Sequence, residues 1–274
     1  MSSSNRSTRH GLTLIELVVV MVILVALAGL LVPTFSAMLT RSHTSTCSTN
    51  IGELNKAIQE YQQLYGRYPN NMDSLTDGTT LITYLAGGSL LPASAGGPGT
   101  NQAGGQITHI TLTDADVAAL GNAGLATVQR MATTPHDPTF DYYPSASPAT
   151  DQATIATGTV LAGIDPTATS NTADVTLCQK LNLPLTGRYV VLGIGPRCDM
   201  IGKTIATAPV HYGDTVPLNP EYGYQRLVGV FKISDSALNF TTAILVAAGP
   251  IHDNGLGTID DELQNWYQLQ NNGT

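Results

Sequence analysis

Glu16 is the residue whose surroundings most require a chemical explanation. It is the fifth residue of an apolar run, residues 12–32, that reads LTLIELVVVMVILVALAGLLV and has Thr13 as its other interruption. The run has the length of about 20 residues that a helix needs to span a hydrocarbon core, where an isolated carboxylate costs about 3 kcal/mol. Glu16 therefore either reaches water at the membrane boundary or has a cationic partner. Cleavage after Gly11 would supply that partner as a free ammonium on Leu12 of a neighbouring copy, and the residues alone leave both interpretations open.

Motifs that would indicate catalysis are incomplete or missing. Gly193 and Gly195 begin a dinucleotide-binding pattern that fails at its third glycine. The sequence has no GK[ST] phosphate loop, no HExxH zinc motif and no GxSxG nucleophile elbow. The densest polar cluster, residues 136–143, is typical of a capped turn before a proline. The histidines of the body are scattered, without an i, i+4 pair for zinc: His109, His136, His211 and His252. We therefore expect that the protein is not an enzyme.

Oxygen-bearing side chains also gather near the C-terminus. Residues 253–255 read Asp-Asn-Gly and residues 260–262 read Asp-Asp-Glu, and oxygen-rich turns of this kind can bind calcium. Their spacing does not fit an EF-hand loop, and the alternative is a capped, solvated helix with Ile259, Leu263 and Trp266 as its apolar stripe. We favour the helix, so no cofactor or metal is predicted, with calcium as the alternative.

Composition and charge indicate where the chain resides. Apolar residues make up 42% of the 274 residues and charged residues 12%, with a net charge of −8. Such a chain can bury a core, and its acidity argues against a nucleic-acid partner. Arg6 and Arg9 precede the apolar run with no acid nearby. By the positive-inside rule they hold the N-terminus in the cytoplasm and send the body across the membrane, into an oxidising compartment.

The cysteines suggest one disulfide in that compartment. Cys178 and Cys198 bracket a predicted strand, and a bond between them would close a loop of roughly twenty residues and stabilise the fold by about 3 kcal/mol. Cys47 lies on a predicted helix and could compete for either partner or stay free. The alternative, that all three are small buried apolar residues, stays open.

A long helix is expected to position Glu16. Pro33 can kink a helix without ending it, and Gly66 is a suitable C-terminal stop with Pro69 just beyond. The first half of the helix is apolar on all sides, which suits a membrane or filament core, whereas the second half suits packing on a domain. That second half has one apolar stripe at three- and four-residue steps: Ile51, Leu54, Ile58, Tyr61, Leu64 and Tyr65.

The rest of the chain predicts an α+β domain with loop-rich insertions. Residues 86–106 and 144–172 are loop-forming by composition. A short helix is expected between residues 114 and 131, capped by Thr113 or Asp114. Three apolar runs near the C-terminus predict strands that no helix separates: residues 189–195, 227–233 and 243–248. The economical fold is an antiparallel sheet laid on the second half of the long helix.

The N-terminal residues carry a family resemblance. Residues 11–17, GLTLIEL, followed by the apolar run and Pro33, resemble the class III signal of type IV pilins and type II secretion pseudopilins. The resemblance implies that a prepilin peptidase cleaves after Gly11 and methylates Leu12, a position where the family most often has Phe. It also implies that Glu16 acts in filament assembly, that Pro33 bends or loosens the helix within the filament, and that the fold is pilin-like.

Two other interpretations of the N-terminus stay open. Ala26-Leu27-Ala28 resembles a signal-peptidase site, although the apolar run continues past it and an acid in such a run is unfavourable. The segment could also be a plain membrane anchor that never leaves the bilayer. We favour the pilin-like interpretation over both.

The resemblance implies an organisation and a function. Residues 1–11 are a leader, residues 12–33 the transmembrane or filament-core half of the helix, residues 34–66 its amphipathic half, and residues 67–274 a periplasmic or extracellular domain. The run YGRYP at residues 65–69, with Leu75 in a polar turn, resembles the segment after the long helix in major pseudopilins.

The implied role is a structural one. The chain would be an inner-membrane subunit that self-assembles into a type II secretion pseudopilus, with the prepilin peptidase and an assembly platform as its other partners. The alternative is a minor pilin or a cell-surface binding module, which the loop-rich insertions favour.

Overall fold

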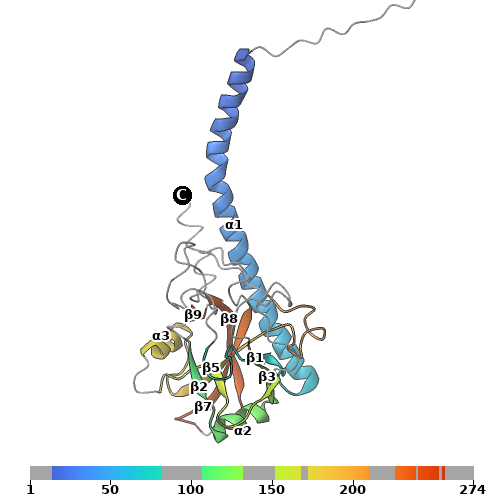
Figure 1. Ribbon diagram of the computed structural model, residues 1–274, viewed down its shortest axis with the longest axis vertical. Coiled ribbons are helices and arrows are strands. Elements are labelled where there is room, and N and C mark those ends of the chain that lie inside the picture. The colour runs from blue at the N-terminus through green and yellow to red at the C-terminus, as the bar shows by residue number, and fades with distance from the viewer. Residues whose placement is uncertain are drawn as a thin grey trace, which may run out of the picture. The chain divides into compact units, whose positions relative to one another are not determined.

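The computed structural model describes residues 14–81, 107–131, 152–167, 172–209, 226–238, 240–252 and 255–256. Among these it describes only the backbone of residues 28–45, 47–48, 172–173, 176, 180, 251–252 and 255–256. These residues form three helices, α1 (Leu14–Tyr65), α2 (Asp114–Asn122) and α3 (Thr172–Lys180). They also form nine strands: β1 (Met72–Asp73), β2 (Thr108–Thr111), β3 (Thr127–Gln129), β4 (Gln152–Thr154), β5 (Val160–Ile164), β6 (Gly187–Gly193), β7 (Leu227–Asp235), β8 (Ile244–His252) and β9 (Gly255–Leu256). The chain divides into two compact units, Met1–Ser42 and His43–Thr274, and α1 contributes residues to both (Figure 1).

The helix α1 ends where the sequence predicts. Gly66 follows its last residue, has a left-handed φ of 68°, and donates its N–H to the carbonyl oxygen of Gln62 at 2.8 Å. Glycine adopts this conformation without the clash that a Cβ would cause. The helix also continues through Pro33. The prediction that this proline does not end the helix is therefore confirmed.

The sheet is organised around β6, β7 and β8, which are antiparallel neighbours. The other edge of β6 is shared between two strands. Its C-terminal end pairs with β1, where Gly193 lies opposite Asp73, and its N-terminal part pairs with β5, where Val190 lies opposite Gly163. The strands β3 and β4 continue the sheet beyond β1, and β2 continues it beyond β5. We call this arrangement the forked edge of β6.

The three predicted strands are confirmed as β6, β7 and β8, but the sheet is larger than predicted and mixed. The strands β1 and β3 are parallel, with Met72 opposite Val128. None of the strands from β1 to β5 is apparent in the sequence pattern, because each has only two to five residues. Such segments are too short for a hydrophobic period to be recognised. Their partners in the sheet are what define them as strands.

The prediction that residues 144–172 form a loop is wrong for the part of this tract that the structure describes. It contains β4 and β5, and Leu161, Ala162 and Ile164 of β5 are fully buried. The small residues that indicated a loop are needed for close packing. A Cβ on Gly163 would lie 2.7 Å from Cγ1 of Ile110 and from the carbonyl oxygen of Tyr189. The other predicted loop, residues 86–106, lies outside the described residues.

The helix expected between residues 114 and 131 is shorter than predicted. It ends at Asn122, and β3 occupies part of the remaining tract. Gly124, with a φ of 85°, turns the chain from α2 towards β3. Of the two proposed caps the structure selects Thr113, which forms a reciprocal capping box with Asp116. Helix α3 was not predicted, because its sequence carries no strong apolar period.

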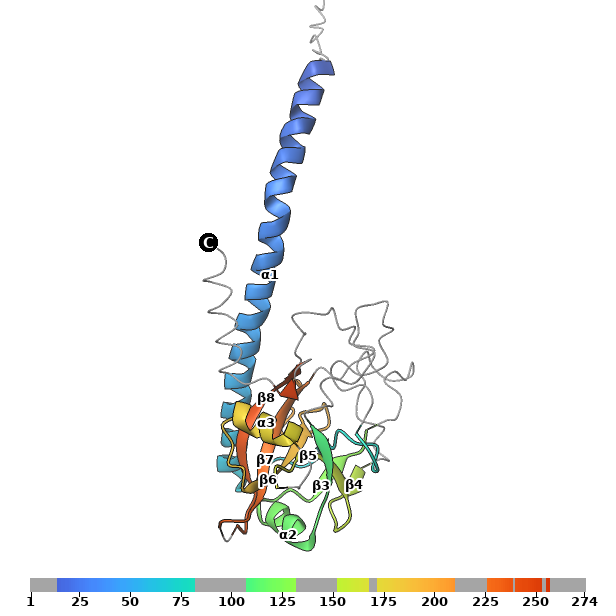
Figure 2. The ribbon, with the colours of Figure 1, turned by 90° about the vertical axis from the view of Figure 1, so that its left-hand side faces the viewer.

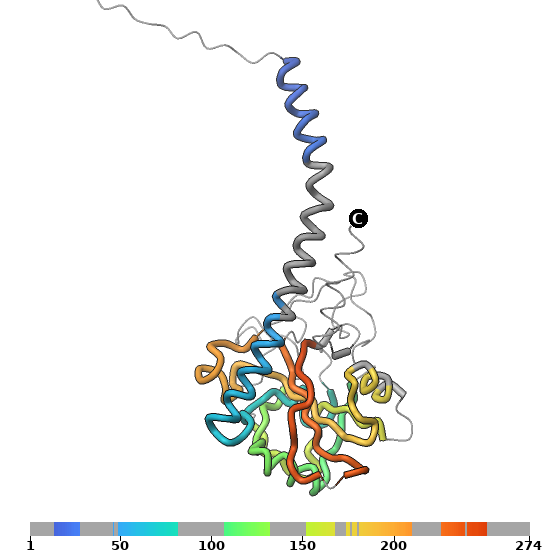
Figure 3. The backbone as a smooth tube through the Cα atoms, turned by 180° about the vertical axis from the view of Figure 1, so that it is seen from behind, coloured from blue at the N-terminus to red at the C-terminus, as the bar shows by residue number. Residues whose placement is uncertain are grey.

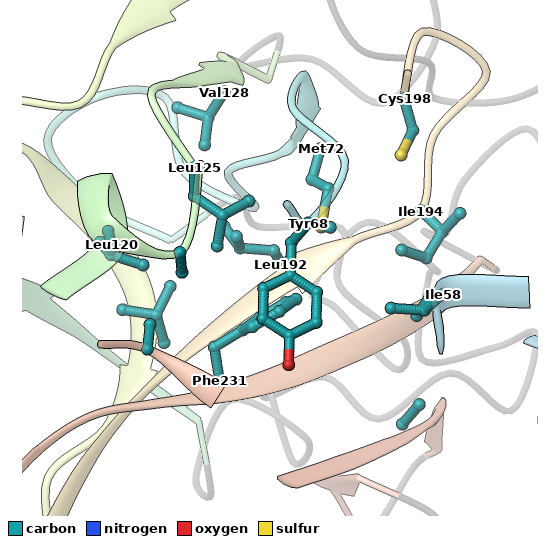
Figure 4. Packing of buried hydrophobic residues seen from close by; sticks show 14 of the residues in the cluster. Ile58, Tyr68, Met72, Leu120, Leu125, Val128, Leu192, Ile194, Cys198 and Phe231 are labelled. Atoms are coloured by element: carbon teal, nitrogen blue, oxygen red, sulfur yellow. The ribbon is translucent and has the colours of Figure 1, made fainter. Parts of the chain in front are cut away.

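The second half of α1 packs on the sheet as predicted. Ile51, Leu54, Ile58 and Tyr61 are at most 2% exposed and share one hydrophobic cluster with residues of β6 and β7. Figure 3 shows this part of α1, in cyan, beside the orange and red strands. Within the cluster, shown in Figure 4, the ring of Tyr68 meets that of Phe231 edge-on at a centroid distance of 5.2 Å. Burial of these side chains is the main favourable term that holds helix and sheet together.

The last two positions of the predicted stripe lie outside this cluster. Leu64 is 65% exposed and Tyr65 is 47% exposed, so the prediction that they belong to the buried stripe is wrong. The Nζ atom of Lys203 lies 5.2 Å from the ring centroid of Tyr65 and 5.4 Å from that of Tyr61. At Tyr65 the cationic side chain of Lys203, and not the apolar core, therefore packs against the end of the helix.

An ion-pair network centred on Arg188 of β6 joins several elements. Its guanidinium bonds to Asp116 of the α2 capping box, and its Nε donates to Asp165, after β5, at 2.9 Å. Its Nη2 donates to the carbonyl oxygen of Thr111 of β2 at 3.3 Å. One planar side chain therefore connects β6 with α2 and with the β2–β5 branch of the sheet.

We predict that this network makes the stability of the domain depend on pH in acid. Burial raises the pKa of Asp165, but hydrogen bonds from Thr167 and Arg188 outweigh it and hold that pKa below its ordinary value. A carboxyl with a lowered native pKa stabilises the fold above its unfolded pKa of about 3.9, and this contribution is lost as pH falls through the native pKa. Asp165→Asn should lower the free energy of unfolding at neutral pH, and the difference from the wild type should shrink below about pH 4. Urea unfolding across that range measures it, and a difference that does not vary with pH would contradict the prediction.

Candidate functional site: the N-terminal segment of α1

The first described turns of α1 expose apolar side chains on every side. Twelve large apolar residues between Leu14 and Leu27 are exposed, from 47% at Val18 to 83% at Leu14. Because they occupy nearly consecutive positions of a helix with 3.6 residues per turn, they leave no polar face. A helix that is apolar all round is stable only where other apolar groups cover it. In the described part of the chain, no helix combines the length and the hydropathy that crossing a bilayer requires.

Glu16 is the only charged residue between Leu14 and Thr40. It lies in the first turn of α1 and is exposed. A carboxylate in the first turn interacts favourably with the positive end of the helix dipole, and amide groups there lack partners within the helix. The position therefore suits an acid whose further role is to meet a positive group close to the helix start. Gly11 and Leu12, the two residues predicted to be processed, lie outside the described residues.

Pro33 lies inside the continuous helix. Since proline has no N–H, the carbonyl oxygen of Gly29 receives no hydrogen bond from it, and the helix is locally weakened without being ended. Whether it bends in an assembly stays a prediction.

Comparison with known families identifies the N-terminal signal. Residues 6–32 match the family described as the prokaryotic N-terminal methylation motif. The N-terminus is a type IV pilin-like signal. The matched residues include Gly11, Leu12 and Glu16, and they extend across Ala26–Ala28, the alternative signal-peptidase site. No curated protein and no solved structure matches the chain.

The pilin-like signal covers only the start of the chain. In the body of the chain, the predicted disulfide between Cys178 and Cys198 is absent. Cys178 and Cys198 are buried free thiols. Cys178 packs in the cluster that contains Tyr189 and Val191, whereas Cys198 packs in the cluster that contains Leu192. Because successive residues of a strand point to opposite faces, the sheet separates the two sulfurs.

Neither of these thiols is poised for chemistry. Burial raises the pKa of both Cys178 and Cys198 to about 12. Both therefore remain protonated at neutral pH and are poor nucleophiles. The side chain of Cys47 lies outside the described residues. The alternative that the cysteines are small buried apolar residues holds for Cys178 and Cys198.

The other candidate site residues of the sequence add little to the candidate functional site. Residues 136–143 lie outside the described residues, as do most residues of the predicted calcium or helix segment, 253–266. In the ranges that the structure describes, no three His, Cys, Asp or Glu side chains gather as a metal site. Gly195, part of the incomplete dinucleotide pattern, has a structural use: a Cβ there would lie 2.3 Å from Oδ1 of the buried Asp73.

The sequence did not indicate the network around Arg188 or the groove beside Arg130 described below. The residues of both are far apart along the chain, and short strands that the apolar pattern does not reveal bring them together. A possible signal for Arg130 was the absence of any Lys or Arg between Arg67 and Arg130, which makes it an isolated cation in an acidic chain.

Proposed function

We propose that the chain is a filament subunit of the pilin-like class, cleaved after Gly11, methylated on Leu12 and assembled through α1. The observation that carries the proposal is the exposed, all-round apolar surface of residues 14–27 directly within a methylation signal. Such a surface must be covered. In our proposal the inner membrane covers it first and the same segments of neighbouring subunits cover it in the filament.

In this proposal Glu16 neutralises the new N-terminus of a neighbouring subunit. The carboxylate lies in the first turn of α1, four positions after Leu12 in the sequence. An ammonium and a carboxylate that are buried together avoid the cost of either charge alone. Because their attraction is satisfied at one axial offset only, the pair fixes the register between subunits.

The proposal also includes a membrane topology and a secretion pathway. Arg6 and Arg9 support an N-terminus in the cytoplasm and a domain in the periplasm. The resemblance of residues 65–69 and Leu75 to major pseudopilins supports a pseudopilus of type II secretion, with the prepilin peptidase and an assembly platform as partners. The role is structural and requires no catalysis. A minor pilin or binding module is the second candidate, favoured by the hydroxyl-lined groove discussed below.

The test is the mature N-terminus of the protein purified from its native envelope. Intact-mass and N-terminal peptide mass spectrometry should show a chain that begins with methylated Leu12. A host that lacks the prepilin peptidase should yield a chain that begins with Met1. A start at Gly29 would support a signal peptidase, and an untouched Met1 in the complete host would support a plain anchor. Either result would overturn the proposal.

A further inference from the structure

A small groove opens between the two branches of the sheet. It has a volume of about 290 Å³ and is lined by residues that follow β1 and by residues of β3, β4, β5 and the turn between β4 and β5. Figure 2 shows β3, β4 and β5 in this region of the second unit. The groove exists because β1 and β5 pair with different parts of β6, so that the strands beyond them diverge. None of its lining residues belongs to α1.

The groove offers hydrogen-bond donors. The guanidinium of Arg130 and the hydroxyls of Thr154 and Thr159 line it. The Thr159 oxygen accepts from the Ala156 N–H at 3.0 Å, so its hydroxyl proton is left to donate. The Thr154 hydroxyl has no hydrogen-bond partner among the described residues. Among the described residues that line the groove there is no Asp or Glu, although the chain has 20 acidic residues against 12 basic ones.

Other hydroxyls of the lining are already used within the protein. Thr76 donates to the carbonyl oxygen of Val160 at 2.9 Å, Ser74 donates to the carbonyl oxygen of Thr76 at 2.9 Å, and Thr157 donates to Asp114. These bonds fix the walls of the groove. They leave Arg130, Thr154 and Thr159 as the groups available to a ligand.

The guanidinium of Arg130 is exposed and, among the described residues, has no ion-pair partner. It packs against the turn at Gly78, where a Cβ would lie 2.9 Å from its Nε. Gly78 has a φ of 99°, so a glycine both forms the turn and leaves room for the side chain. The carboxylate of the adjacent Asp77 accepts from the backbone N–H groups of Thr79 and Thr80, each at 2.8 Å, which engages it within its own turn.

We propose that this groove binds a small organic carboxylate that carries hydroxyl groups, of the size of a single sugar acid. The carboxylate would pair with the planar fork of Arg130, the geometry that favours arginine for such anions. Hydroxyls of the ligand would bond to Thr154 and Thr159. A volume at the lower end of ligand pockets limits the ligand to this size.

The proposal goes beyond filament assembly and does not depend on it. Its test is calorimetric or ligand-observed NMR titration of the full chain in detergent with galacturonate, with neutral galactose as the matched probe. The wild type should bind galacturonate at least about tenfold more tightly than galactose, since a charge-assisted bidentate pair contributes this much or more. Arg130→Gln should remove that preference, and Arg130→Lys should restore only part of it.

Two further variants make the test specific. Lys56→Gln removes the same charge from an exposed position of α1 outside the groove, and it should leave galacturonate affinity unchanged. Thr154→Val keeps the shape of an exposed side chain and should weaken binding several-fold. Equal binding of galacturonate and galactose, no binding by the wild type, or an Arg130→Gln variant that binds as the wild type does would each overturn the proposal.

Discussion

Glu16→Ala is expected to reduce filament yield by about 100-fold or more while the subunit is still cleaved and methylated. Removing one partner of a buried ion pair leaves the other charge uncompensated and costs about 3–5 kcal/mol, and each 1.4 kcal/mol corresponds to about a factor of ten in association. In the proposed filament the uncompensated charge is the ammonium of Leu12. Sedimentation or electron microscopy of sheared filaments measures the yield, and mass spectrometry confirms the processing.

The matched control for this variant is Glu53→Ala. Glu53 lies on the same helix and is exposed, so its replacement removes the same charge from a position outside the proposed filament core. Filament yield should then stay near that of the wild type. Glu16→Gln, which keeps the shape of the side chain, should behave as Glu16→Ala does if charge is what matters. Wild-type yield from Glu16→Ala would contradict the assembly role.

Ile58→Ala is expected to destabilise the folded domain by about 2–5 kcal/mol. Ile58 is fully buried in the cluster that joins α1 to the sheet, and Figure 4 shows it among the residues of this cluster. Truncating it removes the transfer free energy of the lost methyl groups and leaves a cavity that the neighbouring strands can only partly fill. Urea unfolding of the full chain in detergent should show a lower midpoint with an unchanged slope.

The neighbouring residue provides the control. Gln59 is exposed on the same turn of α1, so Gln59→Ala should change the free energy of unfolding by no more than about 0.5 kcal/mol. Since alanine has a higher helix propensity than either residue, similar losses in both variants would mean that the burial of Ile58 on the sheet does not determine the effect. That outcome would also contradict the position of α1 against β6 and β7.

The parts of the fold that were predictable are those whose signals are local. The stripe from Ile51 to Tyr61 repeats at helical spacing, Gly66 has the backbone freedom that ends a helix, and the β6–β8 runs are long enough to recognise. The signal at residues 6–32 is likewise local, since its glycine, acid and apolar run occur together. In each case neighbouring residues carry enough information to define the structure or the motif.

The parts that were not predictable depend on contacts between distant residues. Ala162 and Gly163 suggest a loop by composition, yet β5 is buried because β2 and β6 pair with it. The face of the sheet on which each cysteine lies depends on α3 and on the loop after β6, so Cys178 and Cys198 looked like a pair when only the strand between them was considered. The Arg188 network and the groove at Arg130 likewise require the tertiary arrangement of short strands.

The forked edge of β6 has a consequence for how this domain can change during evolution. The segment between β1 and β2 joins the two branches of the sheet, and the segment between β3 and β4 joins strands of one branch. Insertions there can lengthen or diversify without altering which residues of β6, β7 and β8 face the helix. In the proposed filament, such insertions would change the surface of the branches and leave unaltered the part of each subunit that carries α1.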